Sequence, residues 1–570
     1  MIILSNKALC LSADDNLAEV LPSLLEKKLP ISGFAIVVDI QGRLIGVLNL
    51  HDIFRYYVTS KSLDSSVSVA MNTDPIYSFI SQKPRQILEN VLKMMKVKNI
   101  SNERPLRYIP LLNNDMVVVD VVDTFYLSTQ LLYNTPFVEV FGLGFVGLTL
   151  AGVLASRGFR VHGTDTNDLL ISDLLVGKLN IHEPLLNDMV SSGIKDLLTF
   201  STTSAGSNSS VKIIAVGTPI SNDGSVDLSA LKNATETISK NLTSGDLVML
   251  RSTVPVSTTR NFVIPILEQN SGLIAGSHFH VAFTPERTVE GKAVSELISL
   301  PQIVGGFTPL CAFKALTFWQ SITSSTVKVS SLESAELVKL VNNSFRDLSF
   351  SFSNSLSLLC DKYNINSHDL VAAANEGYPR DRIPFPGPGV GGYCLTKDPL
   401  LYASQYGDLP HSKLASISRN ANISASIYPV QLFHQYCKAF NLSIKNLRIL
   451  IVGIAFKGLP ETNDVRGSIS LSVAKQLSDS GASIYIQDHV ISDDVLSNLG
   501  FEIYSNNLAS LIDAVFILNN HPCNIADGFL ESFREKKTFL FDAWNLLDSV
   551  EVNNNPNFSY ATMGYASFRD

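Results

Sequence analysis

A glycine-rich motif directly after a short apolar stretch is the feature that most constrains how this 570-residue chain can fold. Residues 137–141 (FVEVF) are typical of a buried strand, and GLGFVG at residues 142–147 leads into the apolar segment 148–156. The three glycines would permit a tight turn, the close approach of a pyrophosphate and the close packing of helix on strand, in that order. The motif in this context predicts a strand–turn–helix unit that binds a dinucleotide at the N-terminus of its helix.

A second predicted strand indicates which dinucleotide is bound. Residues 159–164 form this strand, and Asp165 follows it, where a carboxylate would bond the adenosine ribose and repel a 2′-phosphate. Because no arginine follows at residues 166–167, NAD is predicted rather than NADP. The ends of two later strands, 211–216 and 247–250, should meet the same edge of a parallel sheet. The cofactor-binding residues predicted from these strand ends are Gly142, Gly144, Phe145, Val146, Gly147, Asp165, Thr218, Pro219 and Thr253.

Length and charge disfavour several classes of protein. A chain of 570 residues is too long for one hydrophobic core, so three or four domains are expected. The net charge of -8 shows no excess of Lys and Arg for binding nucleic acid or an anionic membrane. The uncharged stretch at residues 140–156 holds four glycines and is short for a bilayer span, so no membrane segment is expected.

The cysteines and histidines favour a reducing cytoplasm and no metal. The six cysteines lie far apart without a Cys-x-x-Cys pair, which disfavours both a zinc site and a dense disulfide framework. No carboxylate or thiol partner recurs at ligand spacing around His182, His278 and His280. The N-terminus has no basic segment followed by a long apolar core, so no secretory signal is expected.

Residues 1–133 contain two related units. The first has a helical pattern at 16–28, strands at 34–39 and 44–48 around a turn at 41–43, and a helix starting near Asp52. The second has a helical pattern at 86–96, strands at 108–112 and 116–122 around a turn at 113–115, and a helix starting at Asp123. The same order of elements occurs twice, which indicates an internal repeat.

This repeat resembles a pair of cystathionine-β-synthase (CBS) domains, a family whose paired modules bind adenine nucleotides. By that resemblance, Asp52 and Asp123 match the ribose-binding aspartate, whereas Asn49 and Asp120 stand where the family has Ser or Thr. Two roles stay open for the module, namely binding of an adenine nucleotide and a purely structural or oligomerising role.

Beyond residue 136 the pattern changes to short apolar strands that alternate with helices, as in parallel α/β sheets. A second strand–helix–strand pattern starts with residues 447–453, and the long helical stretches 332–363 and 412–440 would link the two regions. The predicted domains are a repeat module at residues 1–133, a cofactor-binding domain at 137–330, a central helical domain at 331–440 and a second nucleotide-binding domain at 441–570.

A loop with four glycines precedes Cys394 in the segment GPGVGGYCLTKD at residues 387–398. Glycines let backbone atoms crowd a ligand and can aim amide donors at an anion. Lys397 would favour the thiolate, and the Asp398 carboxylate would handle protons or hold water. Spacing alone leaves open both a reactive nucleophile and an ordinary structural cysteine.

From residue 138 to residue 547 the chain is similar to the UDP-glucose and UDP-N-acetylhexosamine dehydrogenase family. The matching segments occur in the family's order and are residues 142–147, 252–255 (STVP), 283–287 (FTPER), Lys339 with Asn343, the Cys394 loop, and 453–458 (GIAFKG). The resemblance implies an α/β fold with two Rossmann-like doubly wound domains joined by a central long helix and preceded by the α+β CBS-pair module.

The resemblance also implies the reaction, which is an NAD-dependent four-electron oxidation of a UDP-sugar at C6 to the uronic acid. Cys394 would attack the aldehyde formed by the first hydride transfer, and the thiohemiacetal would lose a second hydride to leave a thioester that water hydrolyses. Lys339 and Asn343 lie one helical turn apart and would face the resulting oxyanion. By the same resemblance, the other catalytic residues are Glu286, Asp398 and Thr253.

The remaining contacts that the resemblance implies involve the cofactor and the substrate. Glu290 and Arg466 would touch NAD, with Arg466 reaching it from a neighbouring subunit, and the central helices would form at least a dimer. Lys457, Arg380 and the glycine loop would hold the nucleotide diphosphate. The full predicted substrate site comprises Arg287, Lys339, Asn343, Arg380, Gly391, Tyr393 and Lys457.

Two segments favour an acetamido sugar as the substrate. Residues 343–347 and 378–380 look more like the UDP-N-acetylmannosamine and UDP-N-acetylglucosamine members than like the UDP-glucose members. Lys397 is a feature of UDP-glucose members, so UDP-glucose is the alternative substrate. A second alternative is a non-catalytic nucleotide-sensing protein, but the presence of Cys394, Lys339, Glu286 and Asp398 argues against it.

Overall fold

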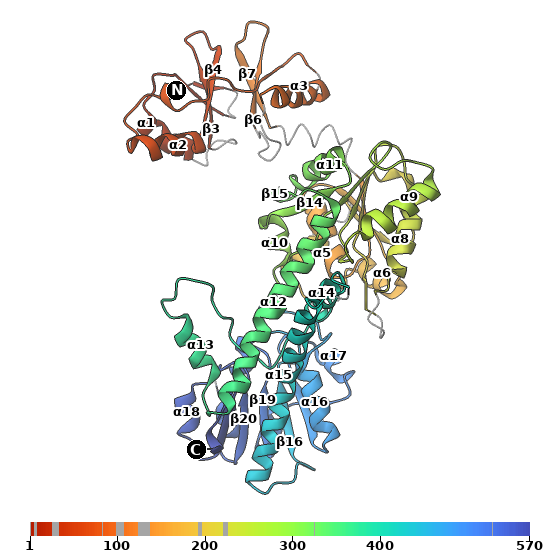
Figure 1. The fold of residues 1–570 in the computed structure, drawn as a ribbon, viewed down its shortest axis with the longest axis vertical. Helices are drawn as coiled ribbons and strands as arrows, with labels where there is room; N and C mark the ends of the chain where they lie inside the picture. Colours follow the sequence, from red (N-terminus) through yellow and green to blue (C-terminus); the bar gives the residue numbers. More distant parts are fainter. Residues whose placement is uncertain are drawn as a thin grey trace. The chain divides into compact units, whose positions relative to one another are not determined.

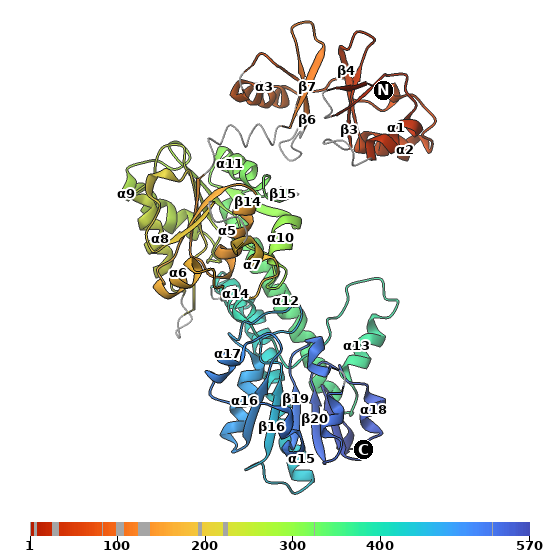
Figure 2. The ribbon, with the colours of Figure 1, turned by 180° about the vertical axis from the view of Figure 1, so that it is seen from behind.

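The chain divides into two compact units, seen from opposite sides in Figures 1 and 2. The first unit comprises Met1–Pro136 with Leu316–Ser321, and the second comprises Phe137–Ala315 and Ile322–Asp570. The structure is a computed structural model that describes residues 2–4, 8–25, 33–82, 84–98, 108–123, 137–179, 181–191, 197–220, 226–323, 325–407, 409–526 and 528–569.

The first unit contains the predicted repeat. Its strands are β1 (Ile2–Leu4), β2 (Ala8–Leu11), β3 (Phe34–Val38), β4 (Leu44–Asn49), β5 (Ser78–Phe79), β6 (Tyr108–Leu112) and β7 (Val118–Asp123), and its helices are α1 (Leu17–Leu25), α2 (Leu50–Ser60), the 3-10 turn η1 (Val67–Val69) and α3 (Pro84–Val97). In the first repeat β2 is parallel to β3, which is antiparallel to β4. In the second repeat β5 is parallel to β6, which is antiparallel to β7, so the same pairing recurs.

The two repeats share a core because their strands are apolar on both faces. One cluster joins β2, β3 and β4 to β6 and β7 through Ile36, Val47, Leu112 and Val121, and the opposite face of the first sheet packs on α1 and α2. Asp123 is the last residue of β7 rather than the start of a helix. The helix predicted to begin there lies outside the described residues.

The second unit begins with an eight-stranded sheet in the order β10-β9-β8-β11-β12-β13-β14-β15, in which only the pair β13 and β14 is antiparallel. Its strands are β8 (Phe137–Phe141), β9 (Arg160–Thr164), β10 (Leu198–Ser201), β11 (Val211–Ile214), β12 (Leu247–Leu250), β13 (His280–Phe283), β14 (Gln302–Gly306) and β15 (Thr326–Lys328). Its helices are α5 (Phe145–Ser156), α6 (Asp168–Leu175), α7 (Leu186–Ser191), η2 (Gly206–Asn208), α8 (Ser229–Ser239), η3 (Thr259–Val263), α9 (Ile264–Ser271), α10 (Ala293–Ser299) and α11 (Pro309–Trp319). Because β8 lies between β9 and β11, the strand order reverses beside the glycine motif, which is where such sheets bind ligands.

Two long helices follow this sheet, as predicted, and cross the middle of Figure 1. The central helices are α12 (Leu332–Asp361), α13 (Ser367–Asn375), α14 (Tyr393–Ser404) and α15 (Ser412–Ala439). Helix α14 corrects the expectation of a loop around Cys394. The loop ends at Gly392, whose φ of 84° turns the chain, and the helix begins at the next residue. Cys394, Lys397 and Asp398 are therefore three and four residues apart on one helical face.

A second Rossmann-like sheet completes the unit, in the order β18-β17-β16-β19-β20-β21-β22. Its strands are β16 (Arg448–Val452), β17 (Ser483–Gln487), β18 (Glu502–Ile503), β19 (Ala514–Ile517), β20 (Thr538–Asp542), β21 (Phe558–Thr562) and β22 (Tyr565–Ala566). Its helices are α16 (Ile469–Asp479), α17 (Asp493–Ser497), η4 (Asn506–Leu511), η5 (Pro522–Ile525), η6 (Leu530–Phe533), α18 (Ser549–Asn553) and η7 (Ser567–Arg569). Along β16, Ile449 and Ile451 enter the core on one face while Leu450 and Val452 enter the core on the other, because side chains alternate along a strand.

In the part of the chain that the structure describes, no helix is both long and apolar enough to cross a membrane.

Candidate active site

The glycine motif forms a tight turn between β8 and α5. Gly142 has a φ of 90°, and a Cβ added there would lie 2.8 Å from the carbonyl oxygen of Ala215 on the neighbouring strand end. A Cβ on Gly147 would lie 1.8 Å from the carbonyl oxygen of Gly142. Gly144 differs, because a Cβ there would meet nothing within 4 Å. Gly142 and Gly147 are therefore required because a side chain there would clash with the protein backbone. Gly144 instead leaves the backbone open to a ligand at the N-terminus of α5.

Asp165 and the later strand ends lie around this turn, as the strand order predicts. The Asp165 carboxylate accepts the backbone N–H of Leu143 at 2.7 Å and that of Asn167 at 2.9 Å. Asp165 thus holds the glycine turn in place from the end of β9. The hydroxyl of Thr218 donates to the carbonyl oxygen of Thr253 at 2.6 Å, which ties the ends of β11 and β12 together.

The predicted nucleophile lies at the start of α14. Cys394 is exposed to solvent, whereas Lys397 and Asp398 on the same helix face are buried. Desolvation by the surrounding protein raises the pKa of the Cys394 thiol, although the ammonium groups of Lys339 and, less strongly, Lys397 lower it. Lys397 thus favours the thiolate, as predicted, but desolvation outweighs it and the net pKa of the thiol is raised.

Helix α12 brings two predicted residues to this helix face. Lys339 and Asn343 are buried and one turn apart, and the Asn343 amide donates to Oδ2 of Asp398 at 2.6 Å. Nζ of Lys397 lies 2.9 Å from Oδ1 of Asp398 without hydrogen-bond geometry. Within the described residues these two buried atoms make no hydrogen bond. Nζ of Lys397 and Oδ1 of Asp398 can thus still form a hydrogen bond with a ligand beside Asn343.

Glu286 is held by a partner that the sequence reasoning missed. Arg251, at the end of β12, is fully buried and forms an ion pair with Oε2 of Glu286 through two of its nitrogens. The other carboxylate oxygen accepts the backbone N–H groups of Arg287 and Thr288, each at 2.7 Å. Desolvation would raise the pKa of Glu286, but Arg251, the Thr288 amide and Lys339 together lower it below its ordinary value. In the sequence, the one sign of this partner was that a charged residue, Arg251, directly follows the apolar run LVML.

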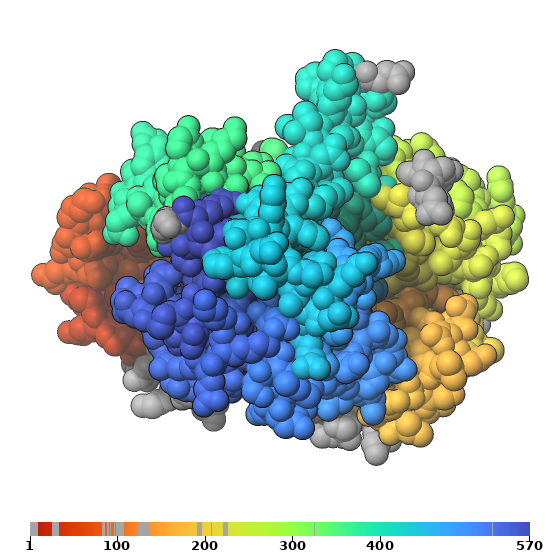
Figure 3. All heavy atoms as spheres, turned by 90° about the horizontal axis from the view of Figure 1, so that it is seen from below, coloured from red at the N-terminus to blue at the C-terminus, as the bar shows by residue number. Residues whose placement is uncertain are grey.

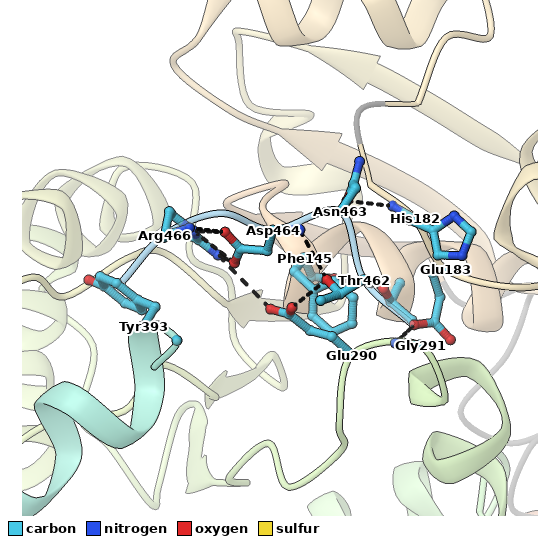
Figure 4. Close-up of polar contacts among 12 residues, drawn as sticks. Phe145, His182, Glu183, Glu290, Gly291, Tyr393, Thr462, Asn463, Asp464 and Arg466 are labelled. Atoms are coloured by element: carbon cyan, nitrogen blue, oxygen red, sulfur yellow. Dashed lines mark hydrogen bonds and ion pairs between the residues drawn. The ribbon is translucent and has the colours of Figure 1, made fainter. Parts of the chain in front are cut away.

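Glu290 meets Thr462 and Arg466 from a segment of the second sheet domain, as Figure 4 shows. Its Oε2 accepts the hydroxyl of Thr462 at 3.0 Å, and its Oε1 lies 4.0 Å from Nη2 of Arg466, which pairs with Asp464. Lys457 donates to the backbone carbonyl of Glu290 at 2.6 Å. Arg466 thus lies beside Glu290 within one chain, and its predicted contact with NAD from a neighbouring subunit stays a prediction.

The glycine loop before Cys394 packs against the protein itself. An added Cβ would lie 2.6 Å from the carbonyl oxygen of Gly467 at Gly391, and 2.7 Å from the Phe456 ring at Gly392. Gly391 and Gly392 therefore allow the second sheet domain to approach α14, and the expected role of the loop in crowding a ligand stays a prediction. Tyr393 completes the contact, because its ring lies 5.1 Å from the guanidinium of Arg466.

A buried polar network fixes the same loop to the long helices. Asp347 of α12 pairs with Arg419 of α15 and accepts the amide of Asn422 at 2.8 Å. Asn354 donates to Asn422 and accepts the backbone N–H of Gly387, both at 2.9 Å. The position of Cys394 is therefore set by α12, α15 and the second sheet domain together.

Three comparisons with known proteins agree with this geometry. Models of the UDP-glucose/GDP-mannose dehydrogenase family match residues 137–339 as its NAD binding domain, 333–424 as its central domain and 450–549 as its UDP binding domain. UDP-N-acetyl-D-mannosamine dehydrogenase of Campylobacter jejuni is 34% identical over 351 residues, which is 60% of this chain and 84% of that protein. The chain belongs to the UDP-glucose/GDP-mannose dehydrogenase family.

Other members of the family support the same assignment. The enzyme named UDP-N-acetyl-D-mannosamine dehydrogenase from Pyrococcus horikoshii is 31% identical over 389 residues, covering 68% of this chain and 89% of that one. A solved structure of the dehydrogenase from that organism has a TM-score of 0.67 at 28% identity, covering 75% of this chain and 99% of the other. A UDP-glucose dehydrogenase structure from Pyrobaculum islandicum has a TM-score of 0.67 at 25% identity, with coverages of 76% and 98%. The family member described here is an NAD-dependent nucleotide-sugar dehydrogenase, which confirms the predicted family, fold class, cofactor and enzyme class.

Two predicted substrate contacts of this dehydrogenase are not brought to Cys394. The guanidinium of Arg380 lies 5.4 Å from the ring of the exposed Tyr378. Arg287 donates to the carbonyl oxygen of Pro301 instead. No contact among the described residues joins either arginine to Cys394.

The N-terminal module of this family member also matches a known model, because residues 3–59 match a CBS domain. Asp52 is buried and forms a capping box with Asn49 at the start of α2, and its other oxygen pairs with Arg55 at 2.9 Å. Desolvation raises the pKa of Asp52. Asp52, which was predicted to bind the ribose, thus already makes hydrogen bonds that hold the start of α2. The side chain of Asp123 lies outside the described residues.

The described part of this dehydrogenase contains no group of three or more His, Cys, Asp and Glu side chains placed to hold a metal. His182 and His521 instead contact the two oxygens of Glu461, at 3.3 and 3.1 Å.

Proposed function

We propose that this enzyme oxidises C6 of a UDP-N-acetylhexosamine, with UDP-N-acetylmannosamine as the first choice, from the alcohol to the acid through Cys394. The observation that carries this proposal is the convergence of α12 and α14, which places Asn343 2.6 Å from Asp398 on the helix face that bears Cys394. The named activities of the relatives from Campylobacter jejuni and Pyrococcus horikoshii support the choice of sugar.

The residues around the glycine turn fit NAD. Gly144 leaves the backbone open, the N-terminus of α5 supplies amide donors for a pyrophosphate, and Asp165 stands at the end of β9 for the ribose. Thr218, Thr253 and Glu290 would line the same site, with Arg466 beside Glu290. When bound, NAD accepts one hydride in each of the two oxidation steps.

Cys394 is proposed to form the covalent bond to the substrate. Its sulfur adds to the aldehyde carbon of the half-oxidised sugar, and the thiol proton leaves to a base. The thiohemiacetal then loses the second hydride and gives its hydroxyl proton to a base, which leaves a thioester. Water cleaves the C–S bond to release the acid and restore the thiol. Since the resting thiol is protonated, a neighbouring base has to take its proton.

Lys339, Asn343 and Asp398 are proposed to hold the reacting oxygens. The Lys339 ammonium is buried and lies close enough to Cys394 to lower the pKa of its thiol, so it can face negative charge on the carbon that sulfur attacks. Oδ1 of Asp398 and Nζ of Lys397 make no hydrogen bond among the described residues. We propose that they hold the water or the substrate hydroxyl.

Lys457 is proposed to face the UDP diphosphate. Desolvation lowers its pKa to about 8, although the Glu290 carboxylate opposes this shift. Lys457 therefore still carries a positive charge at neutral pH, which can pair with a phosphate.

Lys397 beside Asp398 is the specific observation that favours UDP-glucose as the second candidate substrate.

An exposed apolar surface supports the proposal of a homodimer or higher homo-oligomer through the central helices. In Figure 3, α14 and the start of α15 project from the second unit as the teal segment. Leu337, Val341 and Phe345 are exposed at four-residue intervals on α12, and Leu414 and Ile417 are exposed on α15. Large exposed apolar patches mark interaction sites, so size-exclusion chromatography with light scattering should give at least twice the 62.2 kDa of one chain.

Three coarser assignments are also proposals. We propose domain limits of 1–133, 137–330, 331–440 and 441–570, a cytoplasmic location consistent with six free cysteines, and adenine nucleotide binding at the CBS module. A nucleotide would have to compete with the contacts that Asp52 already makes to Asn49 and Arg55.

The proposed reaction is tested by incubating the full chain with NAD and a panel of UDP-sugars, and by measuring NADH and acid formed. Two NADH for each acid are expected with a UDP-N-acetylhexosamine. Cys394→Ala should abolish acid formation, whereas Cys523→Ala, which alters another exposed cysteine, should not. No turnover on any UDP-sugar by protein that binds NAD would refute the proposal.

A further inference from the structure

A buried carboxylate on α12 holds the start of the helix that follows the end of β12. Oε2 of Glu336 accepts the backbone N–H of Ser257 at 2.6 Å, and its Oε1 accepts the backbone N–H and the hydroxyl of Thr259, at 2.8 and 2.6 Å. Glu336 is 1% exposed. Desolvation raises its pKa, and the bonds from Thr259 and Ser257 oppose that rise. One side chain of α12 thus fixes the backbone at residues 257–259.

The contact replaces a helix cap that the local sequence does not provide. Thr259 is the first residue of the helical segment formed by η3 and α9, and Thr258 before it makes no side-chain cap hydrogen bond. The hydroxyl of Thr258 instead donates to the carbonyl oxygen of Pro255 at 2.7 Å. The first N–H groups of a helix have no partner inside it, and negative charge is favourable beside them. Glu336 supplies this cap from another helix.

The chain enters this helix in a strained conformation. Ser257 has a φ of 72°, which is unfavourable for a residue with a Cβ but not for glycine. Such a conformation persists only where its surroundings hold it. Here Glu336 accepts the N–H of Ser257, and Oε1 of Gln405 on α14 accepts the N–H of Val256 at 3.2 Å. The strained residue is therefore bonded to α12 directly and to α14 through its neighbour.

The held segment connects the strand ends of the cofactor domain to the central helices. The carbonyl oxygen of Thr253 accepts the hydroxyl of Thr218 at 2.6 Å, four residues before Ser257. On α12, Glu336 lies three residues before Lys339, so both side chains share one helical face. A shift of the backbone at Ser257 would therefore be passed along a short connection to Thr253.

We propose that Glu336 is a positioning residue that bonds residues 257–259 to α12 and so sets the place of Thr253 relative to Lys339. The role of Glu336 rests on the proposed function, because that function assigns Thr253 to the cofactor and Lys339 to the substrate. Without the bonds to Glu336, Ser257 would relax to a negative φ and Thr253 would leave its working position.

The first test replaces the carboxylate by an amide of the same shape. Glu336→Gln turns an NH₂ group toward a backbone N–H, so at least one of the bonds is lost. The kcat should fall by about tenfold or more, while the KM for the UDP-sugar should change by less than about threefold, because the reacting geometry is affected more than binding. Glu333→Gln, one turn earlier on α12, is the matched control. Glu333 pairs with the side chain of Arg260 and is partly exposed, so kcat should stay within about twofold.

Relief of the strain at Ser257 separates positioning from a general structural role. Ser257→Gly removes the penalty of the positive φ, which corresponds to roughly a tenfold change in population, so it should restore kcat of the Glu336→Gln variant by about tenfold. Ser257→Ala keeps the strain and should restore nothing. In the wild-type background both changes at Ser257 should leave kcat unchanged, because Glu336 already holds the segment.

Thermal unfolding tests the same contact without turnover. Ser257→Gly should act more favourably on the Tm of the wild type, in which the strained φ is held, than on the Tm of Glu336→Gln, in which the strain is already relaxed. The flexibility that glycine adds to the unfolded chain is the same in both backgrounds, so it cancels in this comparison.

The outcomes distinguish this role from the proposed function. A Glu336→Gln variant with the kcat of the wild type would overturn the role of Glu336, and so would a variant that Ser257→Gly restores no better than Ser257→Ala does. If NAD titration shows that Glu336→Gln does not fold, Glu336→Asp, which keeps the charge on a shorter side chain, replaces it in the cycle. A wild type without turnover would refute the proposed function. The Tm comparison would then still decide whether Glu336 holds the segment, because equal shifts in both backgrounds would show that it does not.

Discussion

Substituting alanine at two glycines of the same turn should separate folding from cofactor binding. In Gly147→Ala the new Cβ would lie 1.8 Å from the carbonyl oxygen of Gly142, whereas non-bonded heavy atoms prefer roughly 3.5 Å or more. In Gly144→Ala nothing in the protein lies within 4 Å of the new Cβ. The two variants add the same methyl group, so any difference between them arises from where it points.

The expected magnitudes follow from these distances. Overpacking that side chains can relieve costs about 1–3 kcal/mol, and here the obstacle is backbone, so Gly147→Ala should cost more than about 3 kcal/mol. Gly144 has φ -65° and ψ -171°, which alanine adopts freely, so its replacement should change stability by less than about 1 kcal/mol. The methyl group would nevertheless displace a pyrophosphate from the amides of α5. Loss of one charge-assisted hydrogen bond, about 1.5–3 kcal/mol, corresponds to a Kd roughly 10- to 100-fold higher.

Thermal unfolding and a calorimetric NAD titration measure the two effects separately. Gly147→Ala should lower the Tm and lose NAD binding, and Gly144→Ala should keep the Tm and lose most NAD affinity. An unchanged Tm for Gly147→Ala would refute the packing argument. Wild-type affinity in Gly144→Ala would refute the placement of the pyrophosphate at this glycine.

Burial, titration and ion pairing lead to three further predictions. Burial lowers the pKa of His280 and of His368 to about 4. Between about pH 4 and pH 6.5 these histidines are therefore protonated in the unfolded chain but neutral in the folded chain. The contribution of each histidine to the free energy of unfolding should be fully present above about pH 6.5 and should fall by about 1.4 kcal/mol per pH unit down to about pH 4. His368→Phe should therefore reduce the fall of Tm between these pH values. The KM for the UDP-sugar should rise above about pH 8 as Lys457 loses its proton, and Lys457→Arg should remove this rise; a flat KM up to about pH 9.5 in the wild type would contradict the assignment. Arg419→Met leaves the buried Asp347 unpaired and should destabilise the second unit by about 3–5 kcal/mol, seen as a lower Tm, whereas an unchanged Tm would show that the pair contributes little.

Local patterns were sufficient for the elements that carry the cofactor. The strand at residues 137–141, the long helix from Leu332 and the helix from Ser412 begin where the sequence predicts them. Periodicity and glycine placement act over a few residues, so they can be recognised without knowing the fold. The spacing of Lys339 and Asn343 likewise required only that the segment be helical.

Contacts between distant segments were not predictable in the same way. Arg251 and Glu286 lie 35 residues apart, and the partner of Asn343 lies 55 residues away. Arg466 lies in a different sheet domain from Glu290. Nothing local distinguishes a buried arginine at a strand end from an exposed one, because its environment is supplied by segments that only the fold brings near.

The sequence by itself therefore determined the class of chemistry, because the glycine turn, the acid after the second strand and the Cys394 segment each depend on neighbouring residues. The tertiary structure alone decided the surroundings of each group. It placed Cys394 on a helix rather than in a loop, turned the glycines before it toward the protein, and surrounded Glu286 with cations. Charge state and hydrogen bonding depend on desolvation and on partners from other elements, and these exist only once the chain has folded.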